Sequence, residues 1–413
     1  MISIRTKLTA IIVTLVLFSL STVGFLTISE FTRTISDHMN SYLMQFATQK
    51  AKEYGMSFYR IQNKVDMIVQ YSSSAYEREA PVDLGLNDHL LLPWNGKGFG
   101  GIELETQLKN ERLLLQRVVT FIQRVVSGDP IVTSGYLGTA TSIFACDNLN
   151  AIASLAKLDG YDNTKRAWYN KALSAGKTVW TRPYVDAITK KLCISAVSPV
   201  FLKNRSLLGV AGLDVLMSTL QEDVMKLDIG YKHSYAFLVD NEGKVLAHPG
   251  MNTSGDARWD ENYKADDLLK TGNPEFTNII QDMIMGGTRL GTYIADGGEK
   301  KIIAYAPIPS IKASLGIVLD NNEVMKPITR IKQIILVILA IVFVVSIAVG
   351  IVFSTTITRP IKHLTEISDL ISKGKMDLDT IPEDRKDEIG MLIRSINRLI
   401  ISLKLAIDYR NRQ

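Results

Sequence analysis

Two long apolar runs without any charge constrain this chain more than any other feature of its sequence. The first covers residues 8–29 and the second covers residues 333–358. A helix needs about 20 residues to cross the hydrocarbon core of a bilayer, so each run is long enough to span one. The second run is too long and too uniformly apolar for a core helix of a soluble protein. The sequence therefore predicts a chain that crosses a membrane twice.

The first run has one alternative interpretation, a signal peptide that is cleaved off. Signal peptides have an apolar region of about 7–15 residues and a cleavage site of small residues of the A-x-A type. The run at residues 8–29 is longer than this, and no A-x-A sequence follows it. These features favour a retained membrane helix.

Positive charges flank both runs, and the positive-inside rule places such flanks in the cytoplasm. The flanking cations are Arg5 and Lys7 before the first run, and Arg359, Lys362, Lys373 and Lys375 after the second. Lys326, Arg330 and Lys332 weaken this asymmetry, but long segments cross a membrane largely regardless of their charge. We therefore expect a membrane protein with both ends in the cytoplasm and residues 30–332 on the periplasmic or extracellular side.

The overall charge and the scattered histidines exclude several classes of function. The net charge of +5 is small for 413 residues, and no basic stripe is interleaved with aromatic residues. Nucleic-acid binding is therefore disfavoured. The five histidines are dispersed, and no H-E-x-x-H, G-x-S-x-G or paired cysteine ligands occur in the sequence. The sequence thus predicts neither an enzyme nor a metal or cofactor site.

The two cysteines, Cys146 and Cys193, both lie in the segment expected outside the cytoplasm. An oxidising compartment permits a disulfide between them. The alternative is that each is a small buried hydrophobic residue. The sequence leaves both interpretations open.

The segment between the two runs begins with helices. Residues 30–79 contain one glycine and no proline, which predicts a single helix that continues the first membrane span. A loop is expected at residues 81–101. Apolar residues then recur at helical spacing over residues 103–126, which predicts a second helix.

Strand-like runs and turns follow these helices in two groups. They predict a membrane-distal unit over about residues 80–225 and a membrane-proximal unit over about residues 230–323. In the distal unit, two β-rich runs flank a turn at residues 203–206 and are expected to pair as antiparallel strands. In the proximal unit, a strand pair and three further strand-like runs are expected.

The distal unit contains a set of residues suited to holding an amino acid. An arginine presents a planar fork of donors to a carboxylate, an aspartate can pair with an ammonium, and aromatic side chains exclude water around both. The arginine argues against a bare amine as ligand, and the aspartate argues against a bare carboxylate, although both remain alternatives. The candidate ligand-binding residues are Tyr161, Arg166, Trp168, Tyr169, Tyr184 and Asp214.

The order and spacing of these residues resemble the amino-acid-recognition motif of double Cache (dCache) domains, which occur in bacterial chemoreceptors and sensor kinases. The resemblance covers roughly residues 31–323. It implies that Tyr161, Arg166 and Trp168 contact the ligand carboxylate. It also implies that the remaining three residues of the set hold the α-amino group. Asp214 stands one residue beyond its expected place, which one extra residue in the turn around Asn204 accounts for. Asp186, two residues after Tyr184, is a secondary candidate for the ammonium.

The residues after the second run carry a separate signature. Residues 358–361 begin a helix with a proline in its first turn, and a second helix opens at the sequence D-E-I-G of residues 387–390. A connector is expected at residues 374–382. Apolar residues keep most of a heptad spacing, interrupted at Ser368. These seam positions are Ile357, Ile361, Leu364 and Ile371 in the first helix, and Ile389, Leu392, Ile396, Leu399 and Leu403 in the second.

This signature resembles a HAMP domain, a parallel four-helix coiled coil built by two chains. The resemblance therefore implies a homodimer. Together the resemblances imply a membrane-anchored α+β fold with a long N-terminal helix, two tandem PAS-like antiparallel β-sheet units, two transmembrane helices and a C-terminal coiled coil. The expected domains are residues 1–7 (cytoplasmic), 8–29 (first span), 30–332 (sensor), 333–357 (second span), 358–407 (HAMP) and 408–413 (tail).

The resemblances imply a bacterial protein of the inner (cell) membrane, and the resulting functional hypothesis is a transmembrane receptor without catalytic activity. It would bind an amino acid in the distal Cache unit and relay the event through HAMP to a separate cytoplasmic signalling protein, since the sequence stops shortly after the heptads. One alternative is a chemoreceptor or sensor kinase whose output domain is missing from the sequence. Another is a surface protein that binds a ligand without signalling.

Overall fold

The computed structural model describes residues 4–78, 80–91, 102–158, 161–227, 229–251, 267–373, 375, 380–382 and 384–411. The chain divides into two compact units. One unit contains His38–Met325, and the other contains Met1–Asp37 together with Lys326–Gln413. Residues 92–101 of the predicted loop, and residues 374 and 376–379 of the predicted connector, lie outside the described residues.

Two predicted helices open the chain. α1 (Ile4–Arg78) is one continuous helix, as predicted, and α2 (Ile102–Val126) forms where the helical periodicity placed it. The prediction of a loop is wrong at Leu90–Leu91, which form the short strand β1 and pair with Phe144 and Ala145. A two-residue strand leaves too little alternation for a sequence pattern to reveal it.

A seven-stranded antiparallel sheet forms the distal part of the larger unit. Its order is β1-β3-β2-β7-β6-β4, and β5 also pairs with β6. The predicted neighbours β6 and β7 are confirmed, and Arg205 takes a left-handed conformation in the turn between them. The strands are β1 (Leu90–Leu91), β2 (Ser134–Thr139), β3 (Phe144–Cys146), β4 (Val179–Trp180), β5 (Tyr184–Val185), β6 (Leu192–Phe201) and β7 (Leu207–Leu216).

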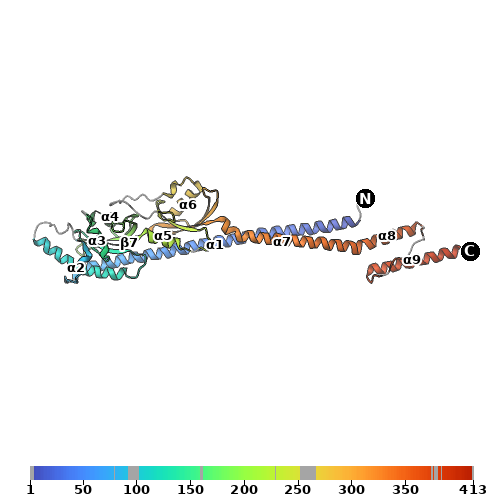
Figure 1. The fold of residues 1–413 in the computed structure, drawn as a ribbon, viewed down its shortest axis with the longest axis horizontal. Coiled ribbons are helices and arrows are strands. Elements are labelled where there is room, and N and C mark those ends of the chain that lie inside the picture. The colour runs from blue at the N-terminus through green and yellow to red at the C-terminus, as the bar shows by residue number, and fades with distance from the viewer. Residues whose placement is uncertain are drawn as a thin grey trace. The chain divides into compact units, whose positions relative to one another are not determined.

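The two faces of this sheet have different coverings, because side chains alternate along a strand. Leu213 and Val215 of β7 belong to a core that includes Val65 of α1 and Val118 of α2. The residue between them, Asp214, therefore points to the opposite face. That face carries α3 (Leu149–Leu155), the short helix η3 (Asn163–Lys165) and α4 (Ala167–Ala175), and in Figure 1 α4 lies on the opposite side of β7 from α2.

The proximal part of the larger unit contains a second antiparallel sheet, with the order β10-β11-β12-β8-β9. The predicted strand pair and the three further strands are confirmed. Helix α6 packs Ile280 and Met283 against Phe237 on one face of this sheet. The elements are α5 (Met217–Met225), β8 (Tyr235–Asp240), β9 (Val245–Ala247), α6 (Pro274–Ile284), β10 (Arg289–Ile294), β11 (Lys300–Ile308) and β12 (Ala313–Asp320).

The two cysteines are both free and buried. Cys146 lies on β3 and Cys193 on β6, and β2 and β7 lie between these strands in the sheet. Three strand spacings amount to about 14 Å, which is twice the greatest Cα separation that a disulfide bridges. The disulfide interpretation is therefore wrong, and the interpretation as buried hydrophobic residues is confirmed.

The smaller unit contains both apolar runs. The run at residues 8–29 lies in α1, and the second lies in α7 (Asn321–Phe353) and the π-helix η6 (Ser354–Thr358). Both helices are long and apolar enough to cross a membrane. They approach closely at Gly24, where a Cβ atom would lie 2.6 Å from Cδ1 of Leu339. Small residues are typical of such close contacts between membrane helices.

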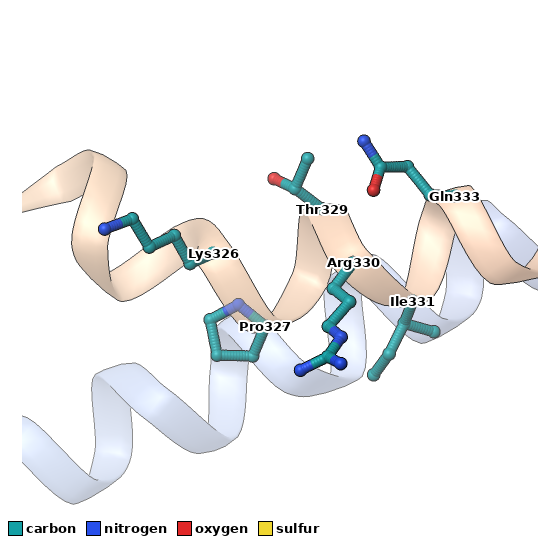
Figure 2. Close-up of a pocket in the computed structure, with 6 residues that line it drawn as sticks. All are labelled: Lys326, Pro327, Thr329, Arg330, Ile331 and Gln333. Atoms are coloured by element: carbon teal, nitrogen blue, oxygen red, sulfur yellow. The ribbon is translucent and has the colours of Figure 1, made fainter.

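An open hollow of about 780 Å³ lies at the start of the second apolar run. Figure 2 shows that its lining side chains leave α7 in different directions, with Thr329 and Gln333 on one side and Pro327, Arg330 and Ile331 on the other. These side chains do not converge on one point. The hollow therefore lacks the convergent polar groups of a small-molecule site.

The C-terminal helices form where the HAMP resemblance placed them. α8 (Arg359–Ser372) has its proline in the first turn, and α9 (Glu388–Asn411) begins within the D-E-I-G sequence. Their shared core contains four of the predicted seam residues. The residues of this core are Leu364, Ile367, Ile371, Ile381, Ile389, Ile393, Ile396 and Ile400. The predicted seam residues Ile361, Leu392 and Leu399 are instead exposed within one chain.

Candidate ligand-binding site

The site is centred on Asp214, whose neighbours on both adjacent strands are serines. β7 pairs with β2 on one side and with β6 on the other, so that Ser134 and Ser195 lie directly opposite Asp214. The hydroxyl of Ser195 donates a hydrogen bond to Oδ1 of Asp214 at 2.5 Å. The hydroxyl of Ser134 lies 3.5 Å from Oδ2. The sheet register thus places a row of three polar side chains across three strands.

Two tyrosines complete the surroundings of this carboxylate. Tyr136 donates its hydroxyl hydrogen to Oδ1 of Asp214 at 2.8 Å. The hydroxyl of Tyr184 lies 2.7 Å from Oγ of Ser195 and 3.5 Å from Oδ1 of Asp214. The Tyr136 ring lies across β7 at Gly212, where a Cβ atom would be 2.6 Å from the ring. Glycine is therefore required at this point of the strand.

Among the residues that the structure describes, the carboxylate of Asp214 has hydroxyl groups as its hydrogen-bond partners. Its side chain is buried, with 5% of the residue exposed. Burial raises the pKa of Asp214 to about 7, the negative charge of Asp186 adds to this rise, and the hydroxyl donors oppose it only in part. Among the described residues, Oδ2 has only the long contact with Ser134. Asp214 therefore has one oxygen available for a positively charged group.

Arg166 provides the opposite charge on the same face of the sheet. It stands between η3 and the first residue of α4, in an extended conformation, and 5% of it is exposed. Burial raises the pKa of Tyr161, Arg166 opposes the rise, and Asp214 and Asp186 add to it. The pKa of Cys193, raised chiefly by burial, responds to the same three charges. One cation and two carboxylates therefore lie within electrostatic reach of Tyr161 and Cys193.

Aromatic rings enclose these charges. The ring centroid of Trp168 lies 4.8 Å from that of Tyr136 and 5.5 Å from that of Tyr169. The ring of Tyr161 packs edge-on against Phe144 at 5.7 Å. Tyr169 is 2% exposed, and its hydroxyl has no hydrogen-bond partner among the described residues. A buried hydroxyl of this kind is available to a bound polar ligand.

Asp186 has a different role from the other predicted residues. Its Oδ2 accepts hydrogen bonds from the backbone N–H and the hydroxyl of Thr189 at 2.7 and 2.6 Å, and its Oδ1 accepts one from the N–H of Ile188 at 3.2 Å. These bonds hold the turn between β5 and β6. The carboxylate of Asp186 is close enough to Asp214 to raise the pKa of Asp214. Both of its oxygens, however, already accept hydrogen bonds from its own turn.

The structure thus brings all seven predicted residues to one face of the distal sheet. Three further residues beside Asp214 were not singled out from the sequence: Ser134, Tyr136 and Ser195. The sequence shows each of them only as a polar residue in a predicted strand. Their position beside Asp214 can be deduced only when the pairing of β2, β7 and β6 is known.

Comparison with known families agrees with the fold. Residues 28–328 match the Cache domain family dCache_1. Because this match covers most of the chain, the protein belongs to the double Cache family and has its membrane-anchored α+β fold. Residues 352–404 match the HAMP domain. The resemblances inferred from the sequence are therefore confirmed.

Curated relatives are bacterial chemotaxis proteins. The methyl-accepting chemotaxis protein McpC of Bacillus subtilis is 28% identical over 289 residues, which cover 70% of this chain and 39% of McpC. McpA of Pseudomonas putida is 28% identical over 256 residues, which cover 60% of this chain and 36% of that protein. The chain therefore spans less than half the length of these relatives.

Solved structures include the ligand-binding domain of the Pseudomonas fluorescens chemoreceptor CtaA in complex with L-isoleucine. It is 20% identical, covers 71% of this chain and 97% of that chain, and has a TM-score of 0.45. The ligand-binding domain of PctB of Pseudomonas aeruginosa in complex with L-Arg is 18% identical, covers 72% and 98%, and has a TM-score of 0.42. Both scores are below 0.5, so the family assignment rests on the sequence match.

Proposed function

We propose that the protein is a chemoreceptor-like membrane receptor that binds a free α-amino acid on the distal sheet. Arg166 would pair with the ligand carboxylate through its planar fork, and Oδ2 of Asp214 would accept a hydrogen bond from the ligand ammonium. The observation that carries this proposal is the buried Asp214, whose partners among the described residues are hydroxyl groups, on the same face of the sheet as the buried Arg166. Trp168, Tyr161 and Tyr169 would exclude water from both ion pairs.

The pairing of opposite charges favours an amino acid over simpler ligands. A bare amine would pair with Asp214 but would bring no carboxylate for the planar donor fork of the buried Arg166. A bare carboxylate would leave Asp214 without a cation. A zwitterion supplies both charges at a fixed short spacing and adds no net charge to the buried site.

We further propose that ligand binding is relayed through the HAMP helices α8 and α9 to a cytoplasmic signalling protein. A ligand shifts a conformational equilibrium by no more than its differential affinity for the two states, typically about 1–3 kcal/mol of coupling. The curated relatives are methyl-accepting chemotaxis proteins, and this similarity supports a signalling role. A passive surface binder would have no use for a HAMP domain, which disfavours that alternative.

Ligand analogues test the binding proposal in the full-length protein reconstituted in nanodiscs. By titration calorimetry, an amino acid should bind, and its α-amide and des-amino analogues should each bind at least about tenfold more weakly, since each loses one charged contact. Arg166→Ala should lower the affinity by about 2–5 kcal/mol because it leaves a desolvated carboxylate unpaired.

Lys165 offers a matched control for Arg166, because it is the adjacent cation and its side chain is 80% exposed. Lys165→Ala should bind as the parent does. Thermal unfolding of each ligand-free variant establishes that it is folded. Binding of a polyamine or a dicarboxylate, with no binding of any amino acid, would refute the proposed ligand class.

A further inference from the structure

The junction between the second span and α8 contains a carbonyl oxygen that lacks its α-helical donor. In an α-helix the N–H of each residue bonds to the carbonyl four residues earlier. Pro360, in the first turn of α8, has no N–H to give to the carbonyl of Thr356 in the π-helix η6. The α-helical bond to the carbonyl of Thr356 is therefore absent at this junction.

Arg385 supplies a donor from the other end of the HAMP connector. Its Nη1 donates a hydrogen bond to the carbonyl oxygen of Thr356 at 2.8 Å, across 29 residues of sequence. The rest of its guanidinium binds Asp387, with Nη2 at 2.6 Å from Oδ2 and Nε at 3.2 Å from both carboxylate oxygens. Arg385 thus bridges a backbone carbonyl and a carboxylate.

Asp387 extends this bridge to the start of α9. Its Oδ1 accepts a hydrogen bond from the N–H of Gly390 at 3.0 Å, which caps the helix. The carbonyl of Arg385 also lies against this first turn, since a Cβ atom at residue 390 would be 2.1 Å from its oxygen. Nη1 of Arg394, one turn further along α9, donates to the same carbonyl at 3.2 Å. Both the side chain and the backbone of Arg385 are therefore held by α9.

We propose that Thr356, Arg385 and Asp387 form a clamp through which the end of the second span positions the start of α9. A displacement of the end of the second span is then transmitted to the start of α9 through these hydrogen bonds, in addition to the covalent path through α8 and the connector. Arg385 is the positioning residue of this Arg385 clamp, and Pro360 keeps the carbonyl of Thr356 available to it. The inference rests on the proposed relay through HAMP.

A double-mutant cycle tests the clamp in the full-length protein in nanodiscs, with amide hydrogen exchange of the first two turns of α9 as the readout. Arg385→Gln should raise this exchange by about tenfold, as expected for the loss of a charged hydrogen bond. Pro360→Ala restores an N–H for the carbonyl of Thr356 and should release the clamp by a different route. In the Pro360→Ala background, Arg385→Gln should then have a much smaller effect.

Arg398→Gln is the matched control, because Arg398 is an exposed arginine of α9 that bonds only locally to Ser395 among the described residues. It should leave the exchange of the first turns unchanged. If the alanine variant does not assemble, Pro360→Ser supplies the same N–H. An effect of Arg385→Gln that is equal in both backgrounds, or absent in the first, would overturn the clamp.

Measurements with and without an amino acid distinguish a failure of the clamp from a failure of the proposed function. When a bound amino acid alters exchange at the start of α9, Arg385→Gln should abolish that change and leave the affinity for the amino acid as in the parent. Absence of amino-acid binding by the parent would refute the proposed ligand, while the mutant cycle would still decide whether the clamp exists.

Discussion

At the scale of single residues, Asp214 combines four hydroxyl neighbours with a buried position. Hydroxyl donors stabilise the ionised form, but burial and the charge of Asp186 act against it and raise the pKa of Asp214 to about 7. An ammonium placed at Oδ2 would reverse this balance. Ligand binding and proton release from Asp214 are therefore coupled in the proposed site.

This coupling predicts a pH-dependent affinity. Because the pKa of Asp214 in the folded, ligand-free protein is about 7 rather than 3.8, the group is protonated below pH 7 and must lose its proton to pair with the ligand. The affinity for an amino acid should thus fall by about tenfold for each pH unit below 7 and level off above it. Calorimetry in buffers of different ionisation enthalpy measures both the affinity and the released proton.

The same shift has a defined effect on stability without ligand. The folded-state pKa is above the ordinary value, so the stabilisation by protonated Asp214 is fully present below about pH 3.8 and is lost as the pH rises through about 7. Asp214→Asn should bind weakly at every pH and should lack this component of the pH dependence. A parent affinity that is constant between pH 5 and pH 8 would contradict the assignment of Asp214 to the ammonium.

Sequence reasoning identified the charged residues of the site more readily than the hydroxyl groups around them. Arg166 and Asp214 are unusual on segments that fold into a core, and the dCache spacing links them. Ser134 and Ser195 are common residue types in strands. Their position opposite Asp214 follows only from a register that joins segments far apart in the chain.

At the scale of elements, alternate residues of β7 have two different roles: one set packs into the core, and the other set faces the site. Leu213 and Val215 pack into the core with α1 and α2, while Gly212 and Asp214 face the site. Gly212 lets the ring of Tyr136 cross the strand and reach the carboxylate. The strand therefore connects packing on one face to the geometry of the site on the other.

A methyl group at Gly212 should disturb both stability and binding. Gly212→Ala places a Cβ atom 2.6 Å from the Tyr136 ring, and overpacking of this kind costs about 1–3 kcal/mol of unfolding free energy. The displaced hydroxyl of Tyr136 should also weaken amino-acid binding. Denaturant unfolding and calorimetry of the full-length protein measure the two effects.

Gly297→Ala is the control for this substitution, because nothing lies within 4 Å of the position that its Cβ atom would take. Its unfolding free energy should stay within about 0.5 kcal/mol of the parent value. Equal stability of the two variants would show that the ring of Tyr136 does not depend on the glycine.

Most helices and strands could be predicted because their periodicity is local. The long helix α1, the pair β6 and β7, and the proline at the start of α8 all follow from patterns within one segment. The two-residue strand β1 and the separation of Cys146 from Cys193 could not be predicted, because both depend on the order of strands in the sheet.

At the scale of the whole molecule, the HAMP helices leave an apolar surface exposed in a single chain. α9 places Ile393 and Ile400 in the core with α8, while Leu392 and Leu399 are exposed. A heptad pattern does not distinguish a seam within one chain from a seam between chains. The predicted seam contains residues of both kinds, and the exposed ones fit the predicted homodimer axis.

Cysteine cross-linking in native membranes distinguishes the residues that pack within one chain from those at the predicted contact between two chains. Leu399 is 50% exposed and Ile400 is 3% exposed. Leu399→Cys should cross-link between two chains, whereas Ile400→Cys should not, and ligand should change the rate for Leu399→Cys. Both native cysteines are fully buried and should not interfere. Faster cross-linking at residue 400 than at residue 399 would contradict the predicted dimer.

The alternation along β7 limits how a receptor of this design can acquire a new ligand. Insertion of one residue between Gly209 and Asp214 would turn the carboxylate of Asp214 toward α1 and α2 and bring Leu213 into the site. Natural variation in specificity should therefore consist of substitutions at every second position of β2, β6 and β7. Changes in length should be confined to the strand ends, such as Val200–Phe201, where the register of this sheet already shifts.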